Sequence, residues 1–556
     1  MYQPIISNNA KQKEIFLNSF AGLNRKEYAK DNEFADMKNL SSDKYPYISV
    51  RKSRDKYSNL KHSNGEITDN DVYATYCNPY DDKCVVRFNG KTLVLPNEDL
   101  GDGIKATDFG KLENGAPENV GAFTDVSGST FKNRLVLGTT ELSSIGTWDK
   151  YFRVGDRISI SGSVNYTYQI NNNKEPYDET IDTIDDEIIT EDVSVYKMVS
   201  CVVEEIDGKT MYVGCYNKNG DPVQLIYSYN SHFINVTIKH LIPKITNACV
   251  SNNRIFGVTE SGKYIYACKQ GDYKRWYTYE GISTDSWYGQ VGTEGGFTGI
   301  VEFNGSVIAF KRDYIYKIYG DNPKNFTIQK QSSDGCIDKK SIVELNGRLY
   351  FLSQNGFCVY SGGYPAIISE VLNRRYMNAT GGTDGRKIYF YAMTISGEKE
   401  LLVYDTMLNM WHKEDTANAI SCFFRYNGEL YFVQETDNEI YKINGYGYSS
   451  GWYFKTPQYN TMGMNYTKLS EVIIYASTGS TSNCSMNVYV LYDGASDGQR
   501  TACGSFTLKP NITQRIPIKI KPCFSYSLAV QGIGAVIIKG IEHIYTAGGK
   551  NDGNRR

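Results

Sequence analysis

The feature that most constrains the fold is a hairpin unit that recurs between residues 249 and 443. In each copy an apolar strand passes through a tight polar turn into an aromatic strand, and a third strand follows after a loop. Asn-Gly and Asp-Gly turns indicate β-hairpins because both central residues of a type I′ turn need positive φ. The turns recur about every 40 residues and are Asn252-Asn253-Arg254, Asn304-Gly305-Ser306, Asn346-Gly347-Arg348, Asp384-Gly385-Arg386 and Asn427-Gly428-Glu429.

A repeat of this length with several strands per unit is typical of β-propeller blades, and a run of unrelated hairpins in a sandwich or meander is the alternative. The same pattern occurs once earlier, around Asn89-Gly90. We therefore predict a first blade or blades at 71–125 and the remaining blades at 246–447. This gives an all-β chain with a propeller of about six blades.

The segments outside the repeat predict two further modules and two loose ends. Alternating strands and an Asp-Gly hairpin predict a small inserted β-barrel at 126–245, with an acidic loop at 175–192. That loop could bind calcium, but it lacks the ordered ligands of an EF-hand loop, which favours a solvated loop. The other expectations are a C-terminal β-sandwich at 448–548, an extended N-terminal arm at 1–70 and a flexible tail at 549–556.

Composition narrows the class of protein. The 46 Tyr and 23 Phe among 556 residues favour pleated sheets. Sixty basic and 62 acidic residues give a net charge of −2, which argues against nucleic acid as the main partner. No apolar run is long enough to span a bilayer and no secretory signal is visible, so we expect no membrane partner and synthesis in the cytoplasm.

The sequence offers little for catalysis. The 12 cysteines include no CxxC pair and the five histidines are scattered, so we expect buried thiols and no metal site. No GxSxG elbow, sialidase box or nucleotide-binding loop is present, so we expect no catalytic residues, no cofactor and no enzyme activity. His412 follows Trp411 at a strand edge and is predicted to pack and form hydrogen bonds. A polysaccharide-cleaving propeller is the enzyme alternative.

Aromatic residues crowd one loop-rich segment of the repeat. Tyr and Trp can present an apolar ring and a polar group to a partner, while many such residues only pack between blades. The possible contact surface for a protein or glycan comprises Tyr273, Trp276, Tyr277, Trp287 and Tyr288, with Tyr279 in the same segment.

Several short segments resemble one family of viral proteins. Residues 20–25 (FAGLNR) and 33–51 resemble the start of tail-associated proteins of bacteriophages and prophages of gut and soil bacteria. The likeness continues at 297–299, 319–320, 360–365 and 404–415. In architecture such proteins are similar to the β-propeller components of phage tails, including the stabilisation and nozzle proteins of short-tailed phages. The Tyr404-Asp405-Thr406 to Trp411 segment is also similar to a kelch blade, so a kelch protein is the second reading.

The resemblance implies a structural component of a bacteriophage virion. Such a protein forms a ring-shaped homo-oligomer in the tail, with six copies expected, as a nozzle, hub or neck-proximal element that helps retain DNA and conduct it during ejection. Its partners are copies of itself and other tail, adaptor or portal proteins, and DNA passes through the lumen without sequence-specific contacts. It is assembled in the host cytoplasm and resides in the virion. The alternative is a receptor- or glycan-binding tail protein that uses the aromatic loops.

Overall fold

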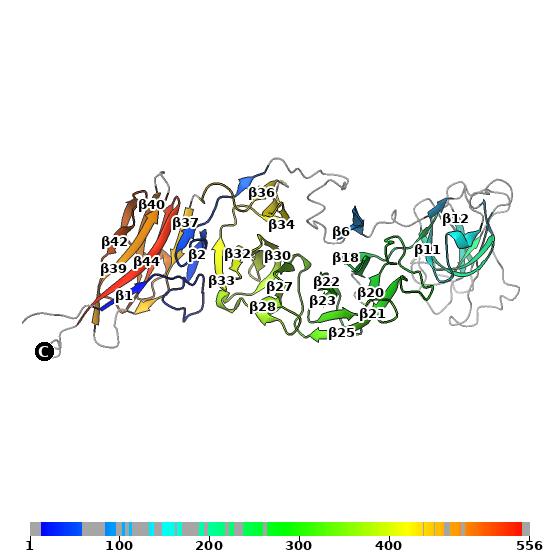
Figure 1. Cartoon of the computed structure of the whole chain (residues 1–556), viewed down its shortest axis with the longest axis horizontal. Coiled ribbons are helices and arrows are strands. Elements are labelled where there is room, and N and C mark those ends of the chain that lie inside the picture. Colours follow the sequence, from blue (N-terminus) through cyan, green and yellow to red (C-terminus); the bar gives the residue numbers. More distant parts are fainter. Residues whose placement is uncertain are drawn as a thin grey trace, which may run out of the picture. The chain divides into compact units, whose positions relative to one another are not determined.

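The computed structural model shows an all-β chain (Figure 1). It describes residues 13–57, 84–95, 103–105, 110–113, 133–137, 147–161, 164–169, 188–193, 198–216, 222–226, 237–259, 264–436, 439–449, 451–460, 467–479 and 484–547. Helical turns in these ranges are the 3-10 segments η2 (Trp148–Lys150), η3 (Lys339–Ser341), η4 (Glu370–Leu372) and η5 (Asp497–Gln499). Within the same ranges no helix is long and apolar enough to cross a membrane.

The chain divides into two compact units, which are described separately. One unit comprises Met1–Pro79, Phe310–Ile315 and Gln331–Arg556. The other comprises Tyr80–Ala309 and Tyr316–Lys330. The acidic stretch expected at 175–192 lies outside the described residues up to 187, as do residues 1–12, 58–83 and the C-terminal tail from 548.

The recurring sequence unit corresponds to four-stranded sheets, five of which occur among the described residues. Four of them take their strands from consecutive segments. The strands are β18 (Ile245–Ser251), β19 (Arg254–Thr259), β20 (Tyr264–Ala267) and β21 (Trp287–Gln290); β22 (Phe297–Phe303), β23 (Ser306–Lys311), β24 (Ile315–Tyr319) and β25 (Thr327–Ser332); β26 (Val343–Leu345), β27 (Arg348–Ser353), β28 (Gly356–Tyr360) and β29 (Ala366–Ile367); β30 (Tyr376–Thr383), β31 (Lys387–Thr394), β32 (Lys399–Asp405) and β33 (Met410–Glu414); and β34 (Ile420–Tyr426), β35 (Glu429–Gln434), β36 (Ile440–Lys442) and β5 (Asp55–Lys56).

The turns that reveal the repeat have the backbone that the hairpin prediction requires. Asn346 and Gly347 have φ of 52° and 67°, and Asn427 and Gly428 have φ of 49° and 81°. Each pair joins the first two strands of its sheet, β26 to β27 and β34 to β35, in an antiparallel ladder. Asn and Gly tolerate this region of φ better than other residues, which explains their recurrence at these positions.

The last of these sheets is completed by a strand from the N-terminal part of the chain. β5 pairs with β36, with Tyr441 opposite Lys56 and Lys442 opposite Asp55. The carboxylate of Asp55 also accepts hydrogen bonds from Ser53 Oγ (2.7 Å) and from the backbone N–H of Tyr446 (2.8 Å). Residues that the sequence predicted as part of an extended arm are thus built into a sheet of the same chain.

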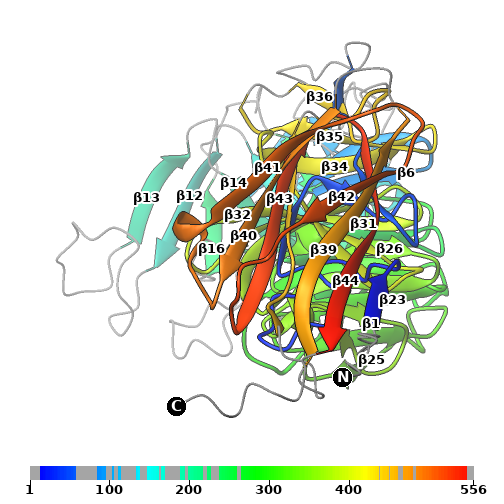
Figure 2. The same cartoon turned by 90° about the vertical axis from the view of Figure 1, so that its left-hand side faces the viewer.

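Residues 451–547 form two sheets together with N-terminal strands. One sheet has the order β3-β4-β44-β39-β42 with β1 also on β44, and the other β2-β37-β43-β40-β41 with β38 also on β43. Figure 2 shows β39 and β44 side by side. The bounds are β1 (Lys13–Leu17), β2 (Asp36–Lys38), β3 (Leu40–Ser41), β4 (Ile48–Val50), β37 (Gly451–Lys455), β38 (Tyr459–Asn460), β39 (Thr467–Thr478), β40 (Cys484–Tyr492), β41 (Thr501–Leu508), β42 (Gln514–Ile518), β43 (Ser525–Ile533) and β44 (Val536–Ala547).

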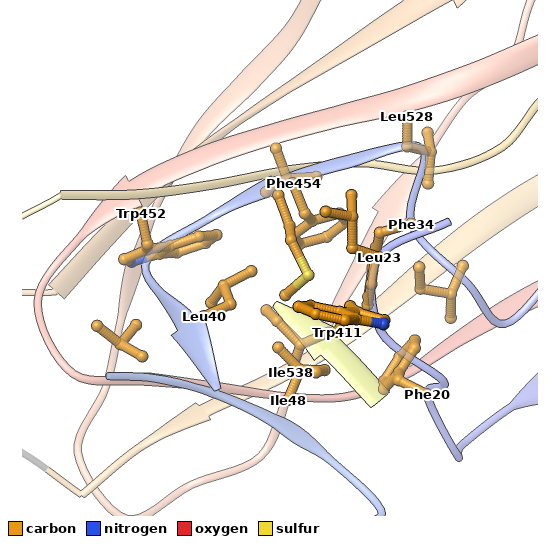
Figure 3. Packing of buried hydrophobic residues seen from close by; sticks show 14 of the residues in the cluster. Phe20, Leu23, Phe34, Leu40, Ile48, Trp411, Trp452, Phe454, Leu528 and Ile538 are labelled. Atoms are coloured by element: carbon orange, nitrogen blue, oxygen red, sulfur yellow. The ribbon is translucent and has the colours of Figure 1, made fainter. Parts of the chain in front are cut away.

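Buried residues from both sheets belong to one hydrophobic core, as in a β-sandwich (Figure 3). The ring of Phe34 lies 5.3 Å from that of Phe20 and 5.1 Å from that of Phe454 on β37. Trp411 of β33 belongs to the same core and donates from its indole N–H to the carbonyl of Ile368 (2.8 Å). The N-terminal residues are single apolar side chains among polar ones, and for that reason they resemble an exposed arm in the sequence although they are buried.

The second unit contains a larger sheet and a separate hairpin. The hairpin is β6 (Cys84–Phe88) and β7 (Lys91–Leu95), joined by Asn89 and Gly90. The larger sheet has the order β13-β12-β16-β15-β14-β11-β17-β8, with β9 and β10 attached. Its strands are β8 (Gly103–Lys105), β9 (Gly110–Glu113), β10 (Asn133–Leu137), β11 (Arg157–Ser161), β12 (Val164–Gln169), β13 (Ile188–Val193), β14 (Met198–Asp207), β15 (Thr210–Tyr216), β16 (Pro222–Ile226) and β17 (Thr237–His240), so two of them precede residue 126.

Candidate contact surface

The aromatic segment singled out in the sequence, residues 273–288, includes the start of β21 and most of the loop that precedes it. This loop, residues 268–286, connects β20 to β21, which are antiparallel neighbours in one sheet. Because both ends of the loop are fixed by the same ladder, its position depends on what holds its interior. Three groups of polar contacts do so.

The first group is centred on Arg254, which is 0% exposed at the start of β19. Its guanidinium donates to the carbonyl oxygens of Cys268 (2.9 Å), Ser283 (2.6 Å) and Thr284 (3.3 Å), and also to that of Asp285. Burial lowers the pKa of Arg254. The buried guanidinium of Arg254 therefore holds carbonyl groups from both ends of the loop together.

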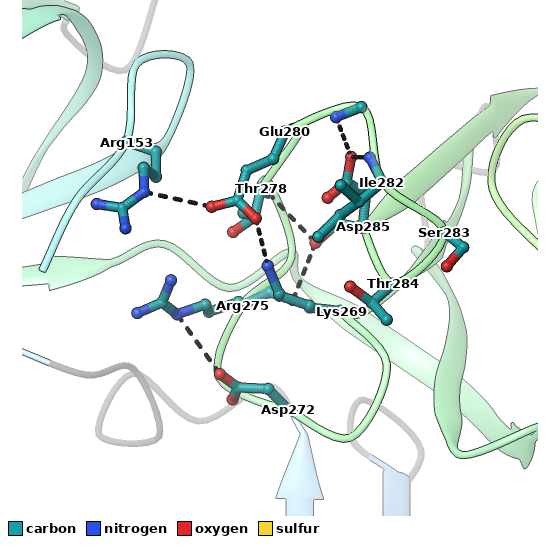
Figure 4. Close-up of polar contacts among 12 residues, drawn as sticks. Arg153, Lys269, Asp272, Arg275, Thr278, Glu280, Ile282, Ser283, Thr284 and Asp285 are labelled. Atoms are coloured by element: carbon teal, nitrogen blue, oxygen red, sulfur yellow. Dashed lines mark hydrogen bonds and ion pairs between the residues drawn. The ribbon is translucent and has the colours of Figure 1, made fainter. Parts of the chain in front are cut away.

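The second group consists of carboxylates within the loop (Figure 4). Asp285 Oδ2 accepts hydrogen bonds from the backbone N–H groups of Gly281 (2.6 Å) and Ile282 (3.0 Å). Glu280 forms ion pairs with Lys269 (2.8 Å) and Arg153 (3.2 Å), and the hydrogen bond from Lys269 is the main reason why the pKa of Glu280 is lowered. These contacts order the tip of the loop.

The third group joins the loop to the larger sheet of the same unit through Asp156, which is 1% exposed. Its Oδ2 lies 3.1 Å from Nε2 of His240 and accepts from the backbone N–H of Arg153 (2.8 Å). Its Oδ1 lies at 3.5 Å from the hydroxyl of Thr278 in the loop. A buried carboxylate with several donors resists rearrangement because each donor would lose a charge-assisted hydrogen bond.

The structure divides the predicted contact residues into buried and accessible ones. Trp276 is 1% exposed and Tyr277 is 9% exposed, and both belong to a core cluster with Ile245 and Ile255. They are packing residues, which corrects their assignment to a contact surface. Tyr273 and Trp287 are half-buried, and Tyr288 is 51% exposed.

The accessible residues form a different cluster from the predicted set. The ring of Tyr288 lies 5.9 Å from that of Tyr279, 6.0 Å from that of Tyr264 and 6.4 Å from that of Tyr266. Tyr279 is 43% exposed and is joined at the loop tip by Ile282, 47% exposed. We call Tyr264, Tyr266, Tyr279, Ile282 and Tyr288 the tyrosine patch.

The patch has a cation beside it. The guanidinium of Arg157, an exposed residue on β11, lies 5.1 Å from the centroid of the Tyr277 ring. Burial raises the pKa of Tyr279, and its protonated hydroxyl can donate as well as accept a hydrogen bond. The sequence signal that could have located Tyr264 and Tyr266 is their i, i+2 spacing on one strand, which places both side chains on one face.

His240 pairs with Asp156, whereas His412 and His543 are buried packing residues. His412 on β33 is 1% exposed, burial lowers its pKa to about 3, and neither ring nitrogen has a hydrogen-bond partner among the described residues. The predicted packing role thus holds in the structure, but the predicted hydrogen bonds are not formed there. Burial also lowers the pKa of His543 to about 4.

The cysteines differ in part from the expected set of thiols. Eight described cysteines are free, and burial raises the pKa of Cys268 and Cys336 to about 12. Cys201 of the second unit and Cys422 of the first unit, in contrast, are each part of a disulfide. This corrects the expectation of thiols at these two positions. Within the described ranges, no group of three His, Cys, Asp or Glu side chains is placed to hold a metal ion.

Comparisons with known proteins give only weak structural similarity. No family model matches the chain, and no curated protein matches it. Solved structures similar to it include an exo-beta-1,3-galactanase from Phanerochaete chrysosporium (10% identity, 52% of this chain, 92% of that chain, TM-score 0.20) and BamB from Moraxella catarrhalis (12%, 45%, 80%, 0.23). Trypanosoma rangeli sialidase is another (9%, 68%, 95%, 0.21). Scores this low carry no argument about activity.

Proposed function

We propose that the chain is a non-catalytic structural component of a bacteriophage virion. In this proposal it is a β-propeller of about six blades with an inserted small barrel and a C-terminal sandwich. Copies assemble into a homo-oligomeric ring in the tail, beside other tail, adaptor or portal proteins, and the ring helps retain and conduct DNA. The resemblance of residues 20–25 and 33–51 to phage tail proteins motivates the family.

The observation that carries a role in assembly is the tyrosine patch on β20, β21 and the preordered loop between them. Tyr and Arg are enriched at the energetic centres of protein interfaces, and Tyr buries a large area at little entropic cost. Arg254, Asp285 and Asp156 fix the loop in advance, so a partner does not have to order it. A rigid aromatic surface of this kind suits repeated contacts between subunits.

The test is the oligomeric state of the purified full chain. We expect a ring by native mass spectrometry and electron microscopy, and its loss in the double variant Tyr279→Ser/Tyr288→Ser. Tyr364→Ser is the matched control because Tyr364 is 85% exposed and lies outside the patch. A chain that remains monomeric at virion-like concentrations and is absent from purified particles would overturn the proposal.

The second candidate is a receptor- or glycan-binding tail protein that uses the same aromatic loop. Exposed tyrosines beside Arg157 could stack on sugar rings. Localisation at the distal tip of the tail, with host-cell binding lost in Tyr288→Ala, would favour this candidate over the ring. Trp276 is unsuitable for this test because it is buried and its replacement would disturb the loop itself.

A further inference from the structure

A groove of about 920 Å³ lies within the first unit, whereas the tyrosine patch belongs to the second. One wall is the outer face of the sheet β2-β37-β43-β40. The other wall consists of residues from the segment around β5 and from the loop before β34. The lining residues used below are Lys38, Arg51, Arg54, Asp415, Asn418, Tyr448, Tyr453, Asn487 and Gln531.

The sheet wall presents a row of residues in register. Lys38 is opposite Tyr453, Tyr453 is opposite Gln531, and Gln531 is opposite Asn487. Residues directly opposite one another share a face of the sheet. Their chain neighbours, such as Phe454 (0% exposed), point into the sandwich core, so the row faces the groove.

The amides along the groove are oriented by one contact each. Gln531 Nε2 donates to the hydroxyl of Tyr489 (3.4 Å), and Asn418 Nδ2 donates to Gln434 Oε1 (2.6 Å). Asn487 Oδ1 accepts from Ser505 Oγ (2.5 Å). The opposite end of each amide forms no further hydrogen bond with the described residues, so each can serve a ligand as a fixed donor or acceptor.

The two arginines of the groove are held by carboxylates. Arg51 pairs with Asp415 (2.5 Å), and Arg54 pairs with Glu414 (3.0 Å) and Asp415 (3.3 Å). The side chains of both arginines are less than 10% exposed, at 9% and 4%. Both arginines are therefore already paired and are not free to bind an anionic ligand, which favours a neutral one, and Lys38 is the remaining cation of the lining.

We propose that this groove binds a neutral oligosaccharide. The ring of Tyr453 would stack on a pyranose face, while the amides of Gln531, Asn487 and Asn418 would bond its hydroxyls. Tyr448, 47% exposed with Lys52 Nζ 4.6 Å from its ring centroid, provides a second ring at the other wall. The volume lies within the usual range of small-molecule sites, about 300–1,000 Å³.

The experiment is calorimetric titration of the purified full chain with neutral hexasaccharides of glucose, mannose, xylose and N-acetylglucosamine, and with hexagalacturonate as an anionic probe. We expect at least one neutral probe to bind with a Kd below about 1 mM. Tyr453→Ala should weaken binding about tenfold or more, and Tyr453→Phe should keep it within about threefold. Tyr475→Ala is the matched control, since Tyr475 lies in the other sheet and bonds Glu542 (2.7 Å).

Each remaining outcome contradicts the proposal. Binding of no neutral probe, equal or tighter binding of hexagalacturonate, or binding that is unchanged in both Tyr453→Ala and Gln531→Ala would overturn it. A change in oligomeric state in Tyr453→Ala without sugar binding would instead assign the groove to a contact between copies. Circular dichroism of each variant checks that the fold is retained. Sugar binding does not depend on ring formation, so the sugar-binding proposal and the ring proposal can each fail without the other.

Discussion

The docking of the N-terminal segment can be tested at Glu400, a carboxylate on β32 that is 2% exposed. It accepts two hydrogen bonds from the guanidinium of Arg25 (2.6 and 3.1 Å) and one each from Tyr376 (2.9 Å) and Arg374 (3.1 Å). Arg25 is also largely buried, at 10% side-chain exposure. Glu400→Gln keeps the shape but leaves the Arg25 charge uncompensated.

We expect Glu400→Gln to lower the free energy of unfolding by about 3 kcal/mol, the lower end of the cost of breaking a buried ion pair. The adjacent pair Lys26–Glu370 is the matched control, because its side chains are 45% and 67% exposed. Glu370→Gln should therefore change stability by less than about 0.5 kcal/mol. Both variants affect the same segment, so only burial distinguishes them.

The assay is urea unfolding followed by tryptophan fluorescence, together with trypsin cleavage in the segment around Lys26 and Lys30. Cleavage should accelerate in Glu400→Gln and stay unchanged in Glu370→Gln. Equal effects of the two variants would refute the reasoning, because the buried pair would then not hold the segment in place.

The same site predicts a pH dependence. Burial alone would raise the pKa of Glu400, but the hydrogen bond and charge of Arg25 outweigh it and the pKa is lowered. A carboxyl with a lowered folded-state pKa contributes its full stabilisation above its unfolded pKa of about 4.3 and loses it as the pH falls through the folded value. The stability difference between wild type and Glu400→Gln should therefore shrink below about pH 4.

Three further sets of variants test other parts of the structure. His412→Leu should gain stability relative to wild type as the pH falls from about 6.5 towards 4, by about 1.4 kcal/mol per pH unit. The reason is that the unfolded wild-type chain binds a proton at His412 in this range while the buried ring of the folded chain does not. Urea unfolding curves of both proteins at each pH measure the difference. Arg254→Met should free the aromatic loop for proteolysis and cost about 3 kcal/mol, whereas Lys269→Met, which breaks a more exposed pair, should cost less than about 1 kcal/mol. Trp276→Ala should cost about 3–5 kcal/mol in thermal or urea unfolding, and Tyr288→Ala less than about 1 kcal/mol while it weakens partner binding.

The repeat was predictable because its signals are local. An Asn-Gly turn such as Asn346-Gly347 fixes the backbone of its own hairpin, and the aromatic strands on either side follow from periodicity. The fourth strand of each sheet carries no such signal. β29 has only two residues, Ala366–Ile367, and both are exposed. Strand β5 cannot be predicted from its neighbouring residues, because its partner strand β36 lies almost 400 residues further along the chain.

The contact surface was only partly predictable for a related reason. The sequence shows that aromatic residues concentrate in 273–288, but whether each side chain is buried or exposed depends on residues distant in the sequence. Trp276 is buried because Ile245 and Ile255 pack in the same cluster, and its indole N–H reaches only the carbonyl of Tyr273 (2.8 Å). The role of Arg254 was missed because carbonyl oxygens, its partners, are present in every residue and leave no mark in a sequence.

The N-terminal segment shows how contacts between distant residues join parts of the first unit. Asn39, held at φ 59°, donates from Nδ2 to the carbonyl of Gly451 (2.7 Å) and accepts at Oδ1 from Arg51 Nε (2.8 Å) and from the backbone N–H of Asp415 (2.9 Å). One side chain thus ties the end of β33 to the start of β37, and separating these strands breaks several contacts together. With local hairpin contacts alone, each sheet could unfold independently. Long-range contacts such as those of Asn39 make unfolding of the first unit more cooperative. The proposed role in an assembly would require that property more than any single strong contact.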